Sequence, residues 1–94
     1  MASASARHIL VDTEEQALDL KKQLDAGADF AELAREHSNC PSGKGGGDLG
    51  EFEPGRMVPE FDRVVFSDLP VGQVSDPVQT QFGYHLLEVQ KRVG

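Results

Sequence analysis

One cysteine and two histidines are the residues of this chain best suited to chemistry. His8 and His85 are each followed by aliphatic residues, so both rings are expected to be partly buried. A buried imidazole must satisfy both ring nitrogens, and a hydrogen-bonded pair, a catalytic base and a metal ligand are three ways to do so. We favour a hydrogen-bonded structural pair. A metal held by His8, His85 and Cys40 is a weaker interpretation, because no local ligand spacing of the zinc type is present.

Cys40 begins an unusual stretch, residues 40–61, with the sequence CPSGKGGGDLGEFEPGRMVPEF. It is too rich in glycine and proline for a long helix or a central strand, yet it carries apolar side chains that are normally buried. It predicts either a loop-lined apolar pocket or a surface loop whose apolar residues fill the edge of the core. Met57 and Phe61 likewise suit ordinary core or an adaptable apolar slot.

Two further interpretations of this stretch are weak. A nucleophilic cysteine needs a base and an electropositive neighbourhood, and Lys44 is close, but no Cys–His signature accompanies Cys40. A pocket-lining thiol is therefore an equal alternative. The run GKGGGDLG at 43–50 fails the phosphate-loop pattern, because no GK[ST] follows and no buried strand leads into a helix. His37 is expected at the surface near a helix end.

Composition restricts the classes of partner. The 94 residues carry 16 acidic and 9 basic side chains, a net charge of -7, with no basic cluster. Nucleic acid and anionic membranes are therefore not expected as partners. With one cysteine, no span-length apolar run and no secretory h-region, the sequence predicts a cytoplasmic location, unless it is a domain excised from a longer protein. We expect a single domain over residues 1–94 and a monomer.

The positions that bear chemistry are placed by a mixture of strands and helices. Thr13 and Gln16 fit a capping box at a helix start, and Gly27 suits its end. The helices are grouped rather than alternating singly with strands, which favours an α+β fold with a largely antiparallel sheet. The expected elements are a frayed start at 1–5, a strand at 7–11, helices from Thr13 to Gly27 and from Asp29 to about His37, a helical turn opened by Pro41, an edge strand at 49–52, a helix opened by Pro59, an edge strand at 73–78 and a last strand at 84–90.

Strand alternation places both histidines beside aliphatic neighbours. In the first strand His8 shares a face with Leu10, and in the last strand His85 shares a face with Leu87 and Val89.

Four motifs in this order resemble the parvulins, a family of small peptidyl-prolyl cis/trans isomerases. They are RHILV, GADFAELAREHSNCPSGKGGGDLGEF, GRMVPEFDRVVF and FGYHLLEV, and the resemblance runs from about residue 6 to residue 92. It is greatest to the short stand-alone bacterial members. The resemblance implies a βαααβαββ fold with a four-stranded antiparallel sheet, and an isomerase that needs no cofactor or metal.

The resemblance also assigns the site. It implies catalytic positions at His8, Cys40, Thr80 and His85, and a proline pocket formed by Leu49, Met57, Phe61 and Phe82. The substrates would be proline-containing peptides and unfolded polypeptides.

The branch of the family that recognises phosphorylated residues carries a basic loop after the first strand, whereas here the segment 12–15 is Asp-Thr-Glu-Glu. We therefore expect an isomerase that is not phosphate-directed. The alternative is a weakly active or inactive parvulin-like module that binds extended or unfolded polypeptide as a chaperone.

Overall fold

The computed structural model describes residues 3–57, 59–66 and 69–93. Its elements confirm the α+β prediction, with the 3₁₀ helix η1 as the third helix of the βαααβαββ order. In chain order they are β1 (Ser3–Val11), α1 (Glu14–Asp25), α2 (Phe30–His37), η1 (Pro41–Gly45), β2 (Asp48–Phe52), α3 (Pro59–Val65), β3 (Val78–Thr80) and β4 (Gly83–Val93).

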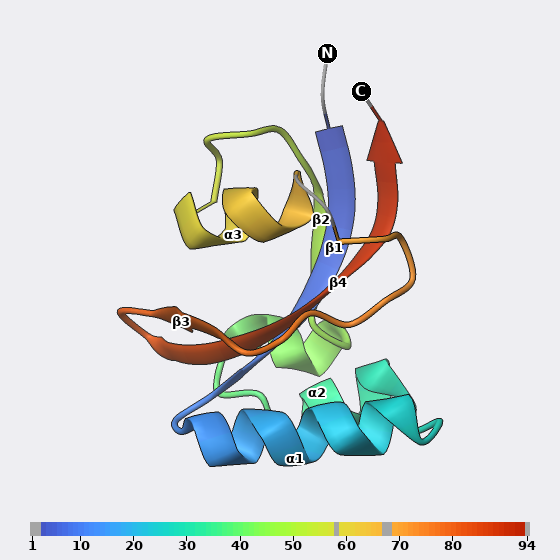
Figure 1. Cartoon of the computed structure of the whole chain (residues 1–94), viewed down its shortest axis with the longest axis vertical. Helices are drawn as coiled ribbons and strands as arrows, with labels where there is room; N and C mark the ends of the chain where they lie inside the picture. Colours follow the sequence, from blue (N-terminus) through green and yellow to red (C-terminus); the bar gives the residue numbers. More distant parts are fainter. Residues whose placement is uncertain (1–2, 58, 67–68, 94) are drawn as a thin grey trace.

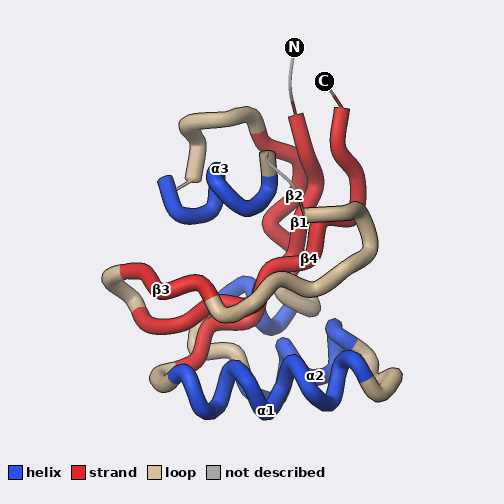
Figure 2. The backbone as a smooth tube through the Cα atoms, viewed as in Figure 1, coloured by secondary structure: helices blue, strands red, loops and turns tan. Residues whose placement is uncertain are grey.

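The sheet is antiparallel throughout, with the strand order β2-β1-β4-β3. Its centre is the long pair β1–β4, which runs from Ser3 opposite Val93 to Val11 opposite Tyr84. Figures 1 and 2 show these two strands side by side, with α3 near the upper half of the sheet and α1 and α2 together below it.

The two faces of the sheet carry separate apolar clusters. On one face, which we call the back face, Ile9 and Leu86 are fully buried against α1 and α2. On the other, the front face, Leu87 and Val89 pack with α3 and with Phe52 of β2. This is the alternation predicted from the sequence, and it assigns His8 and His85 to the front face.

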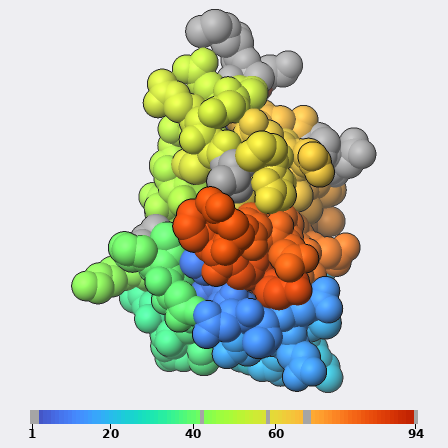
Figure 3. Space-filling model, turned by 90° about the vertical axis from the view of Figure 1, so that its left-hand side faces the viewer, coloured from blue at the N-terminus to red at the C-terminus, as the bar shows by residue number. Residues whose placement is uncertain are grey.

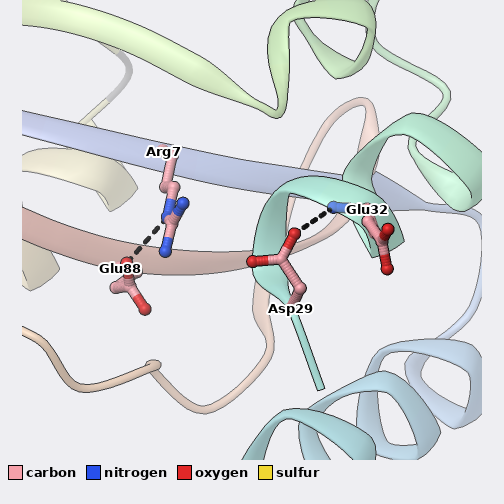
Figure 4. Close-up of polar contacts among 4 residues, drawn as sticks. All are labelled: Arg7, Asp29, Glu32 and Glu88. Atoms are coloured by element: carbon pink, nitrogen blue, oxygen red, sulfur yellow. Dashed lines mark hydrogen bonds and ion pairs between the residues drawn. The ribbon is translucent and has the colours of Figure 1, made fainter. Parts of the chain in front are cut away.

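The predicted caps fix the helices of the back face. Thr13 Oγ1 accepts a hydrogen bond from the Gln16 amide at 3.2 Å, and the Gln16 side-chain oxygen accepts one from the Thr13 amide at 3.2 Å. Helix α1 ends before Gly27, whose φ is 105°. Asp29 begins α2 by accepting a hydrogen bond from the Glu32 amide at 3.1 Å (Figure 4).

Three strand predictions were wrong at their boundaries. Strand β1 starts at Ser3, so residues 3–5 are not frayed, and β4 extends to Val93, because these two segments pair with each other. The strand expected at 73–78 is instead β3 at Val78–Thr80, because Pro77 has no amide hydrogen to donate to a ladder. Before it, Val74 forms only an isolated bridge with Glu88. Within the described residues, no helix is both long and apolar enough to cross a membrane.

Candidate active site

A cavity of about 420 Å³ opens on the front face, and its wall is mostly apolar. Seven of the eight residues predicted for the site line it: His8, Cys40, Leu49, Met57, Phe61, Phe82 and His85. The eighth, Thr80, lies behind His85 and is hydrogen-bonded to it. The structure thus favours the loop-lined pocket over the surface-loop interpretation.

The two central strands place the histidines next to each other. His8 lies opposite Leu87 and His85 opposite Leu10, so the two rings are diagonal neighbours on one face. Their Nδ1 atoms are 3.0 Å apart, the rings stack with centroids 5.2 Å apart, and both residues are 3% exposed. This confirms the hydrogen-bonded buried pair favoured from the sequence.

The protonation of the pair is coupled to the Thr80 hydroxyl. Oγ1 of Thr80 accepts a hydrogen bond from the Phe82 amide at 3.2 Å and lies 2.7 Å from His85 Nε2. If Thr80 donates to Nε2, the proton of neutral His85 lies on Nδ1 and is donated to His8. If Thr80 accepts instead, both imidazole tautomers reverse. One hydroxyl orientation therefore sets the tautomers of both rings.

Burial keeps both rings neutral. It lowers the pKa of His8 from 6.5 to about 4, with a further lowering from the neighbouring His85, and it lowers the pKa of His85 to about 4. A first proton can be accommodated by the hydrogen-bond chain, but a second would make the two Nδ1–H groups face each other. Near neutral pH the pair is therefore an uncharged floor of the cavity.

Helix α3 brings Phe61 onto the two imidazoles. The Phe61 ring meets both edge-on, with centroids 5.6 Å from His8 and 4.7 Å from His85, and the residue is 4% exposed. The turn before the helix is tied to it, because Asp62 Oδ2 accepts a hydrogen bond from the Gly55 amide at 2.8 Å. Met57 and Leu49 complete this part of the wall and are partly buried in the front cluster.

The Cys40 side of the cavity is held by hydrogen bonds from backbone amides. Ser38 Oγ accepts hydrogen bonds from the amides of Leu10, at 3.1 Å, and Cys40, at 3.4 Å. Beyond η1, Gly47 has φ 85°, and its carbonyl accepts from the His8 amide at 2.9 Å. A Cβ at Gly47 would collide with the His8 carbonyl oxygen, so this position requires glycine. The glycine run thus serves close backbone approach, as predicted.

Neither a nucleophile nor a metal centre is assembled in the described part of the chain. There, no hydrogen bond joins the Cys40 thiol to either imidazole, so the histidines are not arranged to deprotonate it as in a Cys–His nucleophile. No group of three or more His, Cys, Asp or Glu within residues 3–57, 59–66 and 69–93 is arranged to hold a metal. His37 lies at the end of α2 with its side chain 47% exposed, as predicted.

The hairpin between β3 and β4 forms one edge of the cavity. Phe82 stands at its tip and is 62% exposed, which is unusual for a phenylalanine. Figure 3 shows this face, with the orange-red hairpin in the centre, the green segment around η1 to one side and the blue start of α1 below. The cavity itself is lined by segments that are distant in sequence, among them residues 39–41, the segment that carries Met57 and Phe61, and the hairpin with Phe82.

Known proteins share this sequence and arrangement. Residues 4–91 match the rotamase family described as the PPIC-type PPIASE domain. The chain belongs to this family, the parvulins. The foldase protein PrsA of Exiguobacterium sibiricum is 50% identical over 88 residues, which cover 93% of this chain and 29% of that protein. The chain therefore spans less than a third of that relative's length.

Solved parvulin structures give the same fold. The crystal structure of the peptidylprolyl isomerase PrsA from Bacillus anthracis has a TM-score of 0.94 and 44% identity, covering 99% of this chain and 43% of that one. The Pin protein of the archaeon Cenarcheaum symbiosum has a TM-score of 0.81 and 42% identity, covering 98% of this chain and 92% of that one. The parvulin fold thus occurs both within longer foldases and nearly alone.

Three residues of this parvulin cavity were missed by the sequence reasoning: Leu10, Asn39 and Pro41. Leu10 could have been found, because it alternates with His8 on the same strand face. Asn39 and Pro41 flank Cys40, but only the fold shows that this segment turns its side chains to the cavity. Asn39 also joins the end of β1, since its Nδ2 donates to Asp12 Oδ1 at 3.0 Å.

Proposed function

We propose that this parvulin domain is a peptidyl-prolyl cis/trans isomerase acting on proline-containing peptides and unfolded polypeptides. The observation that carries the proposal is the front-face cavity, which joins an apolar wall to a buried neutral histidine pair in a chain of the PPIC-type family. A volume of about 420 Å³ is ample for a proline ring and its neighbouring peptide groups.

The reaction requires only that the X-Pro bond be allowed to rotate. Amide resonance sets a barrier of roughly 18–20 kcal/mol, and unaided rotation takes tens to hundreds of seconds. Water stabilises the charge-separated planar amide, so removing water from the carbonyl favours the twisted form. An apolar cavity that grips the ring while the preceding carbonyl turns supplies this environment without a cofactor or metal.

We assign the apolar side chains to the ring. Leu49, Met57, Phe61 and Phe82 would hold the proline, with Phe61 as the rigid wall and Phe82 as the exposed edge. Cys40 would lie beside the rotating carbonyl as a polar or electrostatic group. Non-covalent action fits a thiol that lacks an imidazole partner, and rotation needs no acyl intermediate.

His8, His85 and Thr80 would act as positioning residues. Their hydrogen-bond chain fixes the two rings, and the rings in turn support Phe61 edge-on. Because both imidazoles are neutral near pH 7, they can hold the cavity floor without attracting water as a charge would.

The acidic segment after β1 bears on substrate choice. Residues 12–15 offer three carboxylates and no Lys or Arg to receive a phosphate. Peptides with Leu, Phe or Ala before proline should therefore turn over faster than those with Glu or phosphoserine. The difference should narrow as salt rises.

A protease-coupled assay with a Leu-Pro peptide tests the proposal. The proposed function predicts a rate proportional to protein concentration and well above the uncatalysed rate. No acceleration, together with binding of an unfolded polypeptide, would instead support the alternative, a weakly active or inactive module that binds unfolded chains as a chaperone. A foldase is among the relatives, so this alternative has a concrete basis.

For compartment and assembly we propose the cytoplasm and a monomer, as the composition predicted. The net charge of -7 favours solubility and gives no basic surface for nucleic acid or anionic membranes. Light scattering on the purified chain and fractionation of the source cells would decide these two points.

A further inference from the structure

Just outside the cavity wall, a carboxylate is held in place at the end of β1. Asn39 lines the cavity, and its side-chain amide donates to Asp12 Oδ1 at 3.0 Å. The backbone amide of Asn39 donates to the carbonyl of Leu10, another lining residue, at 2.8 Å. Asp12 is therefore fixed one hydrogen bond behind the wall, with its second carboxylate oxygen left for other partners.

This carboxylate lies next to a cavity whose own lining is uncharged. None of the ten described lining residues is Asp, Glu, Lys or Arg. Arg7 is adjacent to His8 in sequence, but it lies on the back face and is paired with Glu88 at 2.7 Å. Arg56 is adjacent in sequence to the lining residue Met57, and Lys44 lies in η1 after the lining residue Pro41, but neither of these cations lines the cavity. At the β1 end, Asp12 is a charged residue that is hydrogen-bonded directly to a lining residue, Asn39.

The spacing along β1 places Asp12 within reach of a bound peptide. His8 lies by Phe61, where we place the proline ring, and Asp12 is four residues further along. At about 3.3 Å per residue this is roughly 13 Å. An extended peptide has nearly the same rise, and the long stem of Lys or Arg covers much of the remaining distance.

The placement of Cys40 shows whether Asp12 lies on the side of the residue before the proline or of the residue after it. The carbonyl that rotates belongs to the residue before proline, and we have placed Cys40 beside it. Asn39 is the neighbour of Cys40 and carries the link to Asp12. The residue before proline is therefore the one whose side chain lies toward Asp12.

We propose that Asp12 selects substrates with Lys or Arg directly before proline. This inference rests on the proposed isomerase function. It goes beyond rejection of phosphate, because it ranks a cationic residue above a neutral one. The attraction is between solvent-exposed charges, so it changes kcat/KM several-fold and is screened by salt.

Peptides that differ only at the residue before proline test this. We expect kcat/KM at low salt to follow Lys > Leu > Glu, with a Lys-to-Glu ratio of about ten, as for two surface charge contacts of about threefold each. Asp12→Asn keeps the acceptor for Asn39 but removes both charge contacts, so it should lower the ratio toward one, and Asp12→Lys should reverse the preference. The matched control is Asp25→Asn, which removes the same charge roughly 17 Å away at the far end of α1.

Each result has a defined meaning. A Lys-to-Glu ratio of one or less in the wild type, or a ratio that Asp12→Asn leaves unchanged, overturns the inference while Leu-Pro turnover leaves the isomerase function intact. A preference for Lys that appears only after the proline also overturns it. Absence of turnover for every peptide is instead a failure of the proposed function. High salt should reduce the wild-type ratio toward that of Asp12→Asn.

Discussion

Two cavities of about 420 Å³ each lie on opposite faces of the same sheet, and they differ in chemistry rather than in size. The front cavity is bounded by neutral side chains over the His8–His85 pair. The back cavity is bounded by ionic ones: Arg7 pairs with Glu88 at 2.7 Å, its guanidinium lies 4.7 Å from the centre of the Phe30 ring, and Asp29 lies nearby at the start of α2 (Figure 4).

The two cavities have the same volume, so the chemistry of their walls must show which of them binds a ligand. The polar groups of the back cavity largely satisfy one another within the described residues, since Arg7 has its ion pair and Asp29 caps its own helix. The front cavity instead exposes apolar surface, including a phenylalanine at its mouth, that only a ligand can cover. We therefore assign function to the front cavity and structural support to the back one.

The largest loss of isomerase activity is expected when the apolar wall of the front cavity is truncated. Met57→Ala with Phe61→Ala should lower kcat/KM at least tenfold, about the effect of removing a few methylenes from a hydrophobic pocket. Leu24→Ala, which truncates the wall of the back cavity, should leave kcat/KM near the wild-type value. The coupled assay compares the three proteins.

Stability must be measured beside that activity. Phe61 is 4% exposed, so its truncation costs about 3–5 kcal/mol, and Met57→Ala alone provides a variant whose fold is less at risk. A native circular dichroism spectrum with an unchanged isomerase rate would show that the pocket assignment is wrong.

The second effect concerns the histidine pair. His8→Ala or His85→Ala leaves a buried Nδ1 without its partner, which costs about 1–3 kcal/mol, and each kcal/mol lowers Tm by roughly 4–8 °C in a domain of this size. Activity should fall together with Tm. His37→Ala, at an exposed histidine, is the control. Activity lost at an unchanged Tm would favour a direct chemical role for the pair.

The same histidine pair makes the stability of the fold depend on pH. The pKa of both buried histidines is lowered from 6.5 to about 4, so between these values the unfolded chain binds more protons than the folded one. Stability is therefore fully present above pH 6.5 and falls as the pH drops toward 4. The slope is roughly 1.4 kcal/mol per pH unit for each extra proton. Urea unfolding at several pH values measures it, and a slope that survives substitution of both histidines would refute this origin.

Cys40 should matter less than the wall. Cys40→Asp and Cys40→Ser keep a polar group beside the carbonyl, and we expect activity within about tenfold of the wild type, because one polar contact is worth roughly 1 kcal/mol. A bulky replacement should be more damaging because it fills the cavity. A stable covalent peptide adduct seen by mass spectrometry would contradict the non-covalent mechanism.

The smallest change in stability is expected from a substitution on the back face of the sheet, and it should leave activity unchanged. Glu88→Gln breaks the partly buried ion pair with Arg7 and should cost about 1 kcal/mol of stability while leaving kcat/KM unchanged. The Tm and the coupled assay together decide this. A loss of activity at constant Tm would mean that the back cavity takes part in function.

Sequence patterns correctly predicted the features of this fold that depend on interactions between neighbouring residues. The Thr13–Gln16 capping box, Gly27 after α1 and the alternation around His8 each follow from neighbouring residues, and each is found in the structure. The boundaries that failed depend on pairing with distant segments, as at Ser3, which pairs with Val93.

The site, too, combines features that residue type predicts with features that depend on distant parts of the chain. Residue type singled out Cys40, the histidines and the apolar Leu49, Met57 and Phe61, and the family resemblance added Thr80 and Phe82 and joined all of them into one site. The contact of His8 with His85, however, depends on the register of two strands 77 positions apart, and the Asn39–Asp12 hydrogen bond on a loop that returns to the end of β1. Neither can be derived from residue spacing.

Proline peptides are expected to bind at the front cavity and not at the back one, and their X-Pro bond is expected to rotate there. This expectation is tested most directly by following backbone amide resonances of the labelled protein during titration with a Leu-Pro peptide, while exchange between the cis and trans signals of the peptide is recorded. We expect shifts concentrated at Leu49, Phe61 and Phe82, together with accelerated exchange. Shifts concentrated at Leu24, Gly72 and Val74 of the back cavity, or exchange no faster than in buffer, would contradict this expectation.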